Sequence, residues 1–393
     1  MRRIVLAILL LGAACGDNAG PPADASVVGI PGTYEVSGVV RYEDRAPLVN
    51  GADAALADPV PQVARGVTVA LVADNGGAVI AMGTTADDGS YTFTFDATGG
   101  DEVHILVSTT SMTAERPITV RRGDNRIHGF GGETFGAGVI VVEDVLVTIA
   151  SGEAEAFNIF DNMVIGMDRV HAVYADPLPP ALTVFWQTGS TDGTYYFEHA
   201  IHLLGESSDD DGFDDTVMLH ELGHYVEDVE GRTDSPGGSH DGSPTDPRLA
   251  WSEGWSTYFG MAVRDQPIYM DTNAGGGFNQ NLDSEVTKAV LNQSLSQKVS
   301  EDMVAQILWD LGDAPASDDD TFAGTHDADM RVQQQYLKTA LLRNVGSGGA
   351  DLVDFLDGWF VTDGLSHCAD VKTIVLTTHT FPYDFAGPGG TCP

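Results

Sequence analysis

Hydrophobic and polar residues alternate along the first third of the chain. Tyr91, Phe93 and Phe95 alternate with Thr92 and Thr94, and short apolar runs on either side are separated by turn-forming residues. A period of two residues is typical of a half-buried β-strand. Several such strands at regular spacing predict a β-sandwich. The predicted strands span residues 36–42, 67–73, 79–85, 90–96, 103–109 and 117–121.

The pattern changes after about residue 150, where apolar residues recur every three to four positions. Phe157, Phe160, Val164 and Met167 form such a stripe and predict an amphipathic helix. Two strands are predicted next, at residues 182–186 and 195–204. The second of these is either a sheet edge that an extended peptide could join or an interior strand. Further helices are predicted at about residues 214–229, 250–264, 301–311, 330–344 and 351–360.

The first residues form a targeting signal. Met1–Arg3 is basic and Ile4–Leu11 is apolar, but this run is shorter than the ~20 residues that span a bilayer. We therefore predict a signal peptide over residues 1–14. The small residues ending in Cys15 resemble a bacterial lipobox, which implies an exported cell-envelope lipoprotein anchored through a lipid on Cys15. An ordinary cleavage site is the alternative. The Gly- and Pro-rich residues 15–33 are predicted as a flexible linker.

Composition limits the partners of the chain. The 393 residues carry 58 Asp and Glu against 19 Lys and Arg, a formal net charge of -39. Binding to nucleic acid depends on Lys and Arg, so nucleic acid is excluded as a partner, and contact with a membrane is expected only through the lipid. Hydrophobic residues make up 42%, enough for folded cores. Nothing in the pattern indicates an oligomer.

Cysteine usage agrees with export. With Cys15 lipidated, Cys368 and Cys392 remain as an even pair, and we predict a disulfide between them.

The β-rich part has a family resemblance of its own. Val36–Val40, Gly66–Val69 and Thr85–Phe93 together resemble a carboxypeptidase-regulatory-like (transthyretin-like) module. The resemblance implies a spacer, a stabiliser or a binding module over residues 34–128. Residues 129–150 are predicted to connect this module to a second domain, residues 151–393.

One short motif predicts a metal-binding site with a general base. Thr216–Val226 contains His-Glu-x-x-His, with His220 and His224 one helical turn apart and facing the same side. Both imidazoles can therefore reach one metal ion, while Glu221 is placed to act as a general base. Asp214 or Asp215 is expected to cap the helix and Gly231 to end it, and Gly223 allows another backbone to approach closely.

A catalytic zinc ion needs a third protein ligand. Glu253 stands alone among aromatic residues in Ala250–Phe259, and a carboxylate there is costly to bury unless it is paired or binds a metal. His240 is our candidate for stabilising the oxyanion, with Tyr258 and His326 as weaker alternatives.

His-Glu-Leu-Gly-His followed by Trp-Ser-Glu-Gly-Trp resembles the gluzincin zinc metallopeptidases. The resemblance implies one zinc ion held by His220, His224 and Glu253, with Glu221 as general base in peptide-bond hydrolysis. It also implies a zincin-like α+β fold, mainly helical after the active-site helix. The family often has Asp four residues after the Glu ligand, where this chain has Thr257.

Two alternatives stay open from the sequence. Ser208–Asp215 partly matches a calcium loop, although a polar turn with a helix cap accounts for the same residues, and Asp318–Asp320 has the same ambiguity. The whole chain could also be a non-catalytic surface lipoprotein that binds a partner or a polysaccharide, with a structural or vestigial zinc site.

Overall fold

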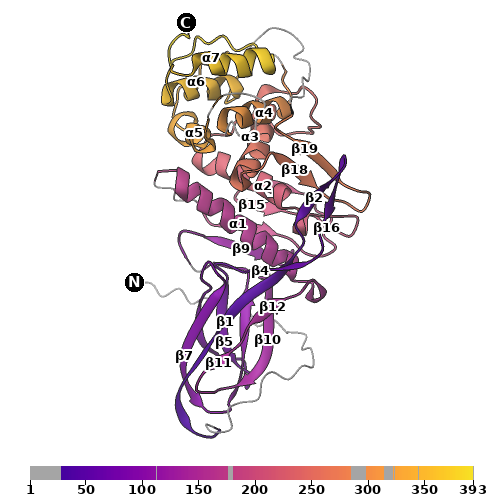
Figure 1. The fold of residues 1–393 in the computed structure, drawn as a ribbon, viewed down its shortest axis with the longest axis vertical. Coiled ribbons are helices and arrows are strands. Elements are labelled where there is room, and N and C mark those ends of the chain that lie inside the picture. Colours follow the sequence, from indigo (N-terminus) through magenta and orange to yellow (C-terminus); the bar gives the residue numbers. More distant parts are fainter. Residues whose placement is uncertain are drawn as a thin grey trace.

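The protein has an all-β region followed by a mixed α/β region with seven α-helices among the described residues, as Figure 1 shows. A computed structural model describes residues 28–111, 113–175, 180–284, 298–313, 322, 324–343 and 345–392. The predicted signal peptide, Cys15, most of the predicted linker and the run Asp318–Asp320 lie outside the described residues. The predicted fold class, a β-sandwich followed by an α+β domain, is confirmed.

Two sheets form the β region, and alternation along their strands buries one face of each. Tyr91, Phe93 and Phe95 point inward as predicted, each at most 8% exposed. The first sheet contains β1 (Pro31–Asp44), β4 (Val60–Val63), β7 (Ser90–Thr98), β11 (Val141–Val142) and β12 (Val145–Val147). The second has the order β10 (Gly129–Gly136), β8 (Glu102–Ser108), β5 (Thr68–Ala73) and β6 (Val79–Thr84).

Two segments pair in sheets that their positions in the sequence did not predict. Residues 129–147, expected to connect two domains, supply β10, β11 and β12 to the sheets of the β region. Strand β9 (Ile118–Arg121), expected in the sandwich, instead pairs in parallel with β13 (Leu182–Phe185). Hydrophobic pattern defines a strand but not its partner, because pairing depends on contacts between distant segments.

The second region begins with the predicted amphipathic helix, α1 (Ala154–Val173), which contacts both β1 and the helix α2 (Asp215–Glu230). In Figure 1 it lies between the β region and the other helices. A small sheet follows in the order β14 (Tyr195–Phe197), β15 (Ala200–His202), β13 and β9. Two short hairpins are formed by β16 (Gly205–Glu206) with β17 (Asp209–Asp210) and by β18 (Ile268–Asp271) with β19 (Phe278–Asn281).

The helices that follow α1 are α2 (Asp215–Glu230), α3 (Pro247–Arg264), α4 (Glu301–Gly312), α5 (His326–Val332), α6 (Leu352–Thr362) and α7 (Cys368–Lys372). Of these, α2, α3, α4 and α6 match predicted segments, α5 differs in extent, and α7 was not predicted. The helix predicted at 330–344 is wrong in its extent, because α5 passes into a π-helical turn, Gln333–Leu337, and ends there. A second π-helical turn, Thr373–Thr378, follows α7.

The strand predicted at residues 195–204 is a hairpin instead. Glu198 and His199 both have positive φ angles, 46° and 65°, and turn the chain back between β14 and β15. Such a turn usually carries Asn-Gly or Asp-Gly, so Glu-His gave no signal for it. As a result β14 is the edge of the small sheet, which was one of the two alternatives.

The ends and the packing of α2 follow the sequence closely. Gly231 terminates the helix, and a Cβ atom on Gly223 would lie 2.6 Å from Cα of Ser256, so the glycine allows α3 to approach. Asp214 occupies the N-cap position, but its side chain does not cap the helix. It accepts a hydrogen bond from the backbone N–H of Thr272 (2.9 Å) instead.

Two further observations concern export and anchoring. The predicted disulfide between Cys368 and Cys392 is confirmed, with their Cα atoms 5.7 Å apart. Across the described part of the chain, every helix is too short or too polar to cross a bilayer.

Candidate metal centre

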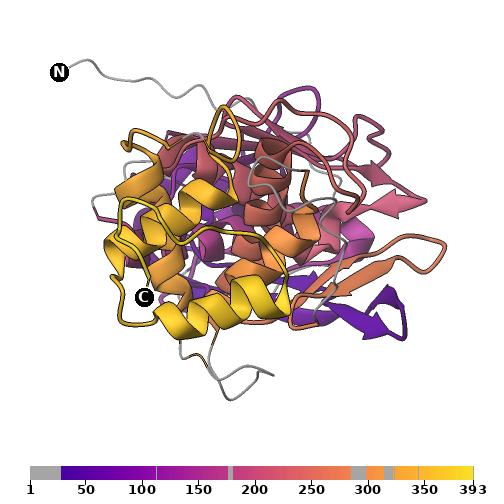
Figure 2. The same cartoon turned by 90° about the horizontal axis from the view of Figure 1, so that it is seen from above.

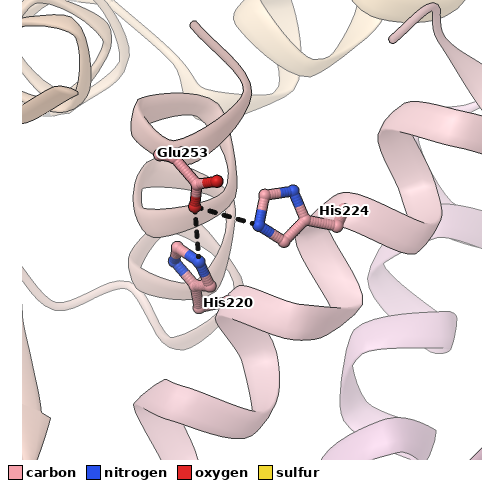
Figure 3. Close-up of side chains that lie close together, drawn as sticks. All are labelled: His220, His224 and Glu253. Atoms are coloured by element: carbon pink, nitrogen blue, oxygen red, sulfur yellow. Dashed lines mark hydrogen bonds and ion pairs between the residues drawn. The ribbon is translucent and has the colours of Figure 1, made fainter. Parts of the chain in front are cut away.

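His220, His224 and Glu253 meet between two packed helices. Both histidines lie on the same face of α2, and Glu253 faces them from α3, as Figure 3 shows. Oε2 of Glu253 lies 3.3 Å from Nε2 of His220 and 3.2 Å from Nε2 of His224. One ligand atom from each of the three residues lies within 4.8 Å of the other two. The structure therefore brings together all three residues that the sequence proposed as metal ligands.

The chemistry of these donors fits zinc. Two imidazole nitrogens and one carboxylate oxygen are a ligand set that zinc takes in catalytic sites. Burial disfavours a charged Glu253, but hydrogen bonds from His220 and His224 outweigh it and hold the pKa of Glu253 below its usual range. Burial lowers the pKa of His224, whereas the hydrogen bond and charge of Glu253 raise it to about 9. Protons and a metal ion would therefore compete for the same nitrogen.

Glu221 has the placement expected of a base. It is 7% exposed, and its Oε2 atom is buried without a hydrogen-bond partner among the described residues. Burial raises the pKa of its carboxyl, and the nearby imidazoles of His220 and His224 lower it in part. A buried carboxylate oxygen without a protein partner is unusual and is expected to bind a water molecule, an ion or a substrate group.

His240 is also present at the site. Its Nε2 atom lies 3.5 Å from Oε2 of Glu253, and its Nδ1 atom lies 3.2 Å from a carboxylate oxygen of Glu301 on α4. The hydrogen bond to Glu301 raises the pKa of His240 above its ordinary value. Of the three candidates for the oxyanion-stabilising role, this is the one that the structure places beside the proposed ligands.

The other two candidates lie elsewhere. Tyr258 is fully buried, and its hydroxyl lies 3.2 Å from Nδ1 of His326, in a polar cluster that also includes Asp329. Tyr258 follows Glu253 by five residues on α3, and at 100° per residue it points to another side of the helix. We therefore correct the sequence-based suggestion for Tyr258 and His326, which pack behind the site.

Both histidines proposed as ligands are held through their Nδ1 atoms. Oγ1 of Thr257 lies 3.0 Å from Nδ1 of His220, so Thr257 fills the place where the family often has Asp. Oγ of Ser252 lies 3.2 Å from Nδ1 of His224 and donates to Oε2 of Glu227 at 2.6 Å. Such partners fix the orientation and tautomer of a metal-binding histidine.

Three residues that support the proposed site histidines were not predicted from the sequence: Ser252, Glu227 and Glu301. Signals existed for the first two, because Ser252 directly precedes Glu253 and Glu227 lies one turn after His224 on α2. No local signal connects Glu301 to His240, because the contact spans 61 positions.

The proposed ligands line a cleft of about 1400 Å³. On one side the edge strand β14 exposes Phe197 (60% exposed), and on another the hairpin β18–β19 exposes Phe278 (51%). Eleven of the described lining residues are Asp or Glu, and none of the described lining residues is Lys or Arg. The cleft therefore combines apolar side chains with a strongly negative charge.

A cluster of three aspartates lines the same cleft. One carboxylate oxygen each from Asp209, Asp211 and Asp271 lies within 4.8 Å of the others, and the first two belong to the segment with the partial calcium pattern. Burial raises the pKa of Asp211 to about 7 and that of Asp271 to about 6. Binding of calcium by these carboxylates remains a prediction.

Comparison with known proteins gives one informative match. Residues 178–356 match the family described as Mycolysin C-terminal domain, a range that contains the whole candidate centre but less than half of the chain. No curated protein matches the chain. The family match hints at a zinc metallopeptidase.

Two solved structures are similar to parts of the chain. The major plantain pollen allergen Pla l 1 shares 15% identity over 30% of this chain and 98% of its own, with a TM-score of 0.15. A 9R-lipoxygenase from Cyanothece PCC8801 shares 9% identity over 42% of this chain and 27% of its own, with a TM-score of 0.17. Both scores are too low to support an argument.

Proposed function

We propose that this protein is a zinc-dependent peptidase in which His220, His224 and Glu253 hold the metal ion. The observation that carries the proposal is the convergence of these three donors beside the unpartnered carboxylate oxygen of Glu221, in an open cleft. A structural zinc site is closed by a fourth protein ligand and needs no base, whereas a catalytic site keeps one position open. The match to the Mycolysin C-terminal domain supports the same conclusion.

The residues around the centre have separate roles in this proposal. A bound zinc ion supplies a Lewis acid for the scissile carbonyl and lowers the pKa of a water molecule. Glu221 accepts the proton of the attacking water and delivers it to the leaving amine. His240 donates a hydrogen bond to the carbonyl oxygen as it gains negative charge, and Glu301 holds the ring of His240 in place. An extended peptide can pair with the free edge of β14.

Location is part of the proposal. The basic and apolar residues 1–14 followed by Cys15 support export and attachment through a lipid. The disulfide Cys368–Cys392 supports an oxidising compartment outside the cytosol. We therefore propose an enzyme of the bacterial cell envelope or exterior, with peptides or proteins as substrates.

Replacement of the base is the decisive experiment. We expect Glu221→Gln to bind zinc stoichiometrically but to hydrolyse casein or a peptide about 10²–10⁴-fold more slowly than wild type. A chelator should abolish wild-type cleavage. Glu206→Gln, at an exposed position on β16, is the matched control and should retain activity. If Glu221→Gln is as active as wild type, Glu221 is not the base and the proposal fails.

A further inference from the structure

The β region sends one hairpin to the neighbourhood of the cleft. β2 (Pro47–Asn50) and β3 (Asp53–Leu56) pair with each other and are part of neither sheet of the sandwich. Figures 1 and 2 both show this hairpin beside β18–β19, and the two hairpins are in contact. Ala54 is only 2% exposed, whereas Leu48 and Val49 of the same hairpin are 43% and 45% exposed. Val49 pairs directly with Ala54 and shares its face, so the burial is local to Ala54, whose backbone meets the turn of β18–β19.

Specific hydrogen bonds join the two hairpins. The backbone N–H of Ala54 donates to the carbonyl oxygen of Gly276 (2.9 Å). The side-chain amide of Asn279 donates to the carbonyl oxygens of Asp53 (2.7 Å) and Gly51 (3.3 Å). These bonds tie the turn and the second strand of β18–β19 to the β region.

The glycines of the β18–β19 turn make this approach possible. Gly276 and Gly277 have φ angles of +125° and +76°, which favour glycine. A Cβ atom on Gly277 would lie 2.4 Å from the carbonyl oxygen of Asp271 and 3.2 Å from that of Ala54. A larger residue would therefore have to move either the turn or the hairpin of the β region.

The same β18–β19 hairpin forms a wall of the cleft. Residues of a strand alternate between faces, so Phe278 and Gln280 lie on the face opposite to Asn279, and all three residues line part of the cleft. The ring of Phe278 lies 6.4 Å from that of Tyr269, which in turn packs edge-on against the ring of His220 at 6.1 Å. A continuous series of contacts thus connects the β2–β3 hairpin to the proposed metal centre.

Strand β18 and the start of the turn are fastened to the second region, whereas β19 is fastened to the β region. β18 is held because the backbone N–H of Met270 donates to Oγ1 of Thr216 on α2 (2.8 Å). The first part of the turn is held as well, because the backbone N–H of Thr272 donates to Asp214 (2.9 Å) and that of Ala274 donates to the carbonyl oxygen of Ser208 (2.9 Å). Among the described residues, the polar bonds from outside the hairpin to β19 and to Gly276 involve Ala54 and the side chain of Asn279. A two-stranded hairpin is only marginally stable by itself, so this attachment of the second strand adds to the rigidity of the wall.

We infer that the β2–β3 hairpin positions the substrate wall β18–β19, so that the β region helps to determine how tightly a peptide binds in the cleft. This inference rests on the proposed function for the identity of the ligand, a peptide. Neither β2 nor β3 lines the cleft among the described residues, so the hairpin acts through the wall and not by touching the peptide.

The hairpin can be removed at a defined point. The backbone N–H of Ala57 donates to the carbonyl oxygen of Ala46 (3.0 Å), so the chain ends are already adjacent at the hairpin base. Replacing residues 47–56 by a two-residue Asn-Gly turn should reclose the chain there. In the full chain we expect this replacement to raise KM for a peptide about tenfold while kcat and zinc content stay within about twofold.

A double-mutant cycle separates positioning from direct contact. Asn279→Ala should raise KM in the wild-type background but add nothing after the hairpin is replaced, because its partner is gone. Gln280→Ala, on the next residue of β19, bears no hydrogen bond to the β2–β3 hairpin among the described residues and is the matched control. Its effect should be the same in both backgrounds. Additive effects of Asn279→Ala and hairpin replacement would overturn the inference.

A second variant covers the case in which the replacement does not fold. Ala54→Leu keeps the hairpin but enlarges a side chain at the buried contact, and it should raise KM in the same direction. If Ala54→Leu folds and changes neither KM nor amide exchange in β18–β19, the inference is wrong.

Amide hydrogen exchange over residues 268–281 distinguishes this inference from the proposed function. It is measured on Glu221→Gln, with and without the hairpin, and does not depend on turnover. Faster exchange after hairpin replacement supports the attachment even if the wild type proves not to be a peptidase. Unchanged exchange overturns it even if the wild type is an active peptidase.

Discussion

The hydroxyl of Thr257 lies 3.0 Å from Nδ1 of His220. It stands one turn after Glu253 on α3, so one helix supplies both a proposed metal ligand and the residue that orients another. A neutral hydroxyl can accept the Nδ1–H bond that fixes the imidazole tautomer. The absence of a carboxylate at this position is therefore compatible with a working site.

Loss of this hydroxyl should weaken metal binding. We expect Thr257→Val, which has nearly the same shape, to lower zinc affinity about 10–100-fold, because His220 loses the partner of its second nitrogen. Competition with a chromophoric chelator measures the affinity. Thr257→Ser keeps a hydroxyl and should restore most of it. Equal zinc affinity for Thr257→Val and wild type would refute this role of Thr257.

His240 should affect the chemical step more than metal binding. We expect His240→Ala to lower kcat about 10²–10³-fold, as the loss of an oxyanion-stabilising donor does, with zinc content unchanged. Steady-state kinetics and metal analysis on the same preparation test this. If kcat is retained, another group stabilises the oxyanion; if zinc is lost, His240 is a ligand instead.

Stability should fall as pH rises because of a buried acid. Burial raises the pKa of Asp214 to about 8, while hydrogen bonds from Thr272 lower it in part. In an unfolded chain the pKa of Asp is about 3.9, so the folded state binds this proton more tightly. The resulting stabilisation is complete below about pH 4 and is lost as pH rises through about 8.

Asp214→Asn removes this titration while an amide oxygen can still accept the bonds from Thr272. Between pH 5 and pH 8, urea unfolding should show a smaller loss of unfolding free energy for Asp214→Asn than for wild type. Asp58→Asn, at an exposed position, is the control and should keep the wild-type pH dependence. Identical pH dependence for Asp214→Asn and wild type would contradict the prediction.

The charge of the cleft should select substrates. Because its described lining residues include eleven carboxylates and no Lys or Arg, we expect Lys- or Arg-containing peptides to have a higher kcat/KM than matched Glu-containing peptides. The ratio should decrease with added salt, which screens exposed charges over about 10 Å at 0.1 M. A ratio near one, or one that does not change with salt, would count against electrostatic selection.

The limits of sequence-based prediction follow from how far apart the interacting residues are. The spacing of His220 and His224 is a property of one helix, and the helical pattern around Glu253 is also local, so both were predicted. The turn at Glu198 and His199 was missed because its residues are not those that usually adopt positive φ angles. The pairing of β9 with β13 was missed because alternation does not specify a partner strand.

The sequence by itself determined the two fold classes, the helix that carries His220 with its stop at Gly231 and the disulfide pair, and it proposed the site residues His220, Glu221, His224 and Glu253. Each depends on periodicity, on spacing within one helix or on a small choice of cysteines. Only the tertiary structure decided that Glu301 contacts His240, that Tyr258 and His326 lie apart from the proposed ligands, and that the β2–β3 hairpin contacts a wall of the cleft. These contacts join segments tens to hundreds of residues apart, and close packing of the folded chain brings them together.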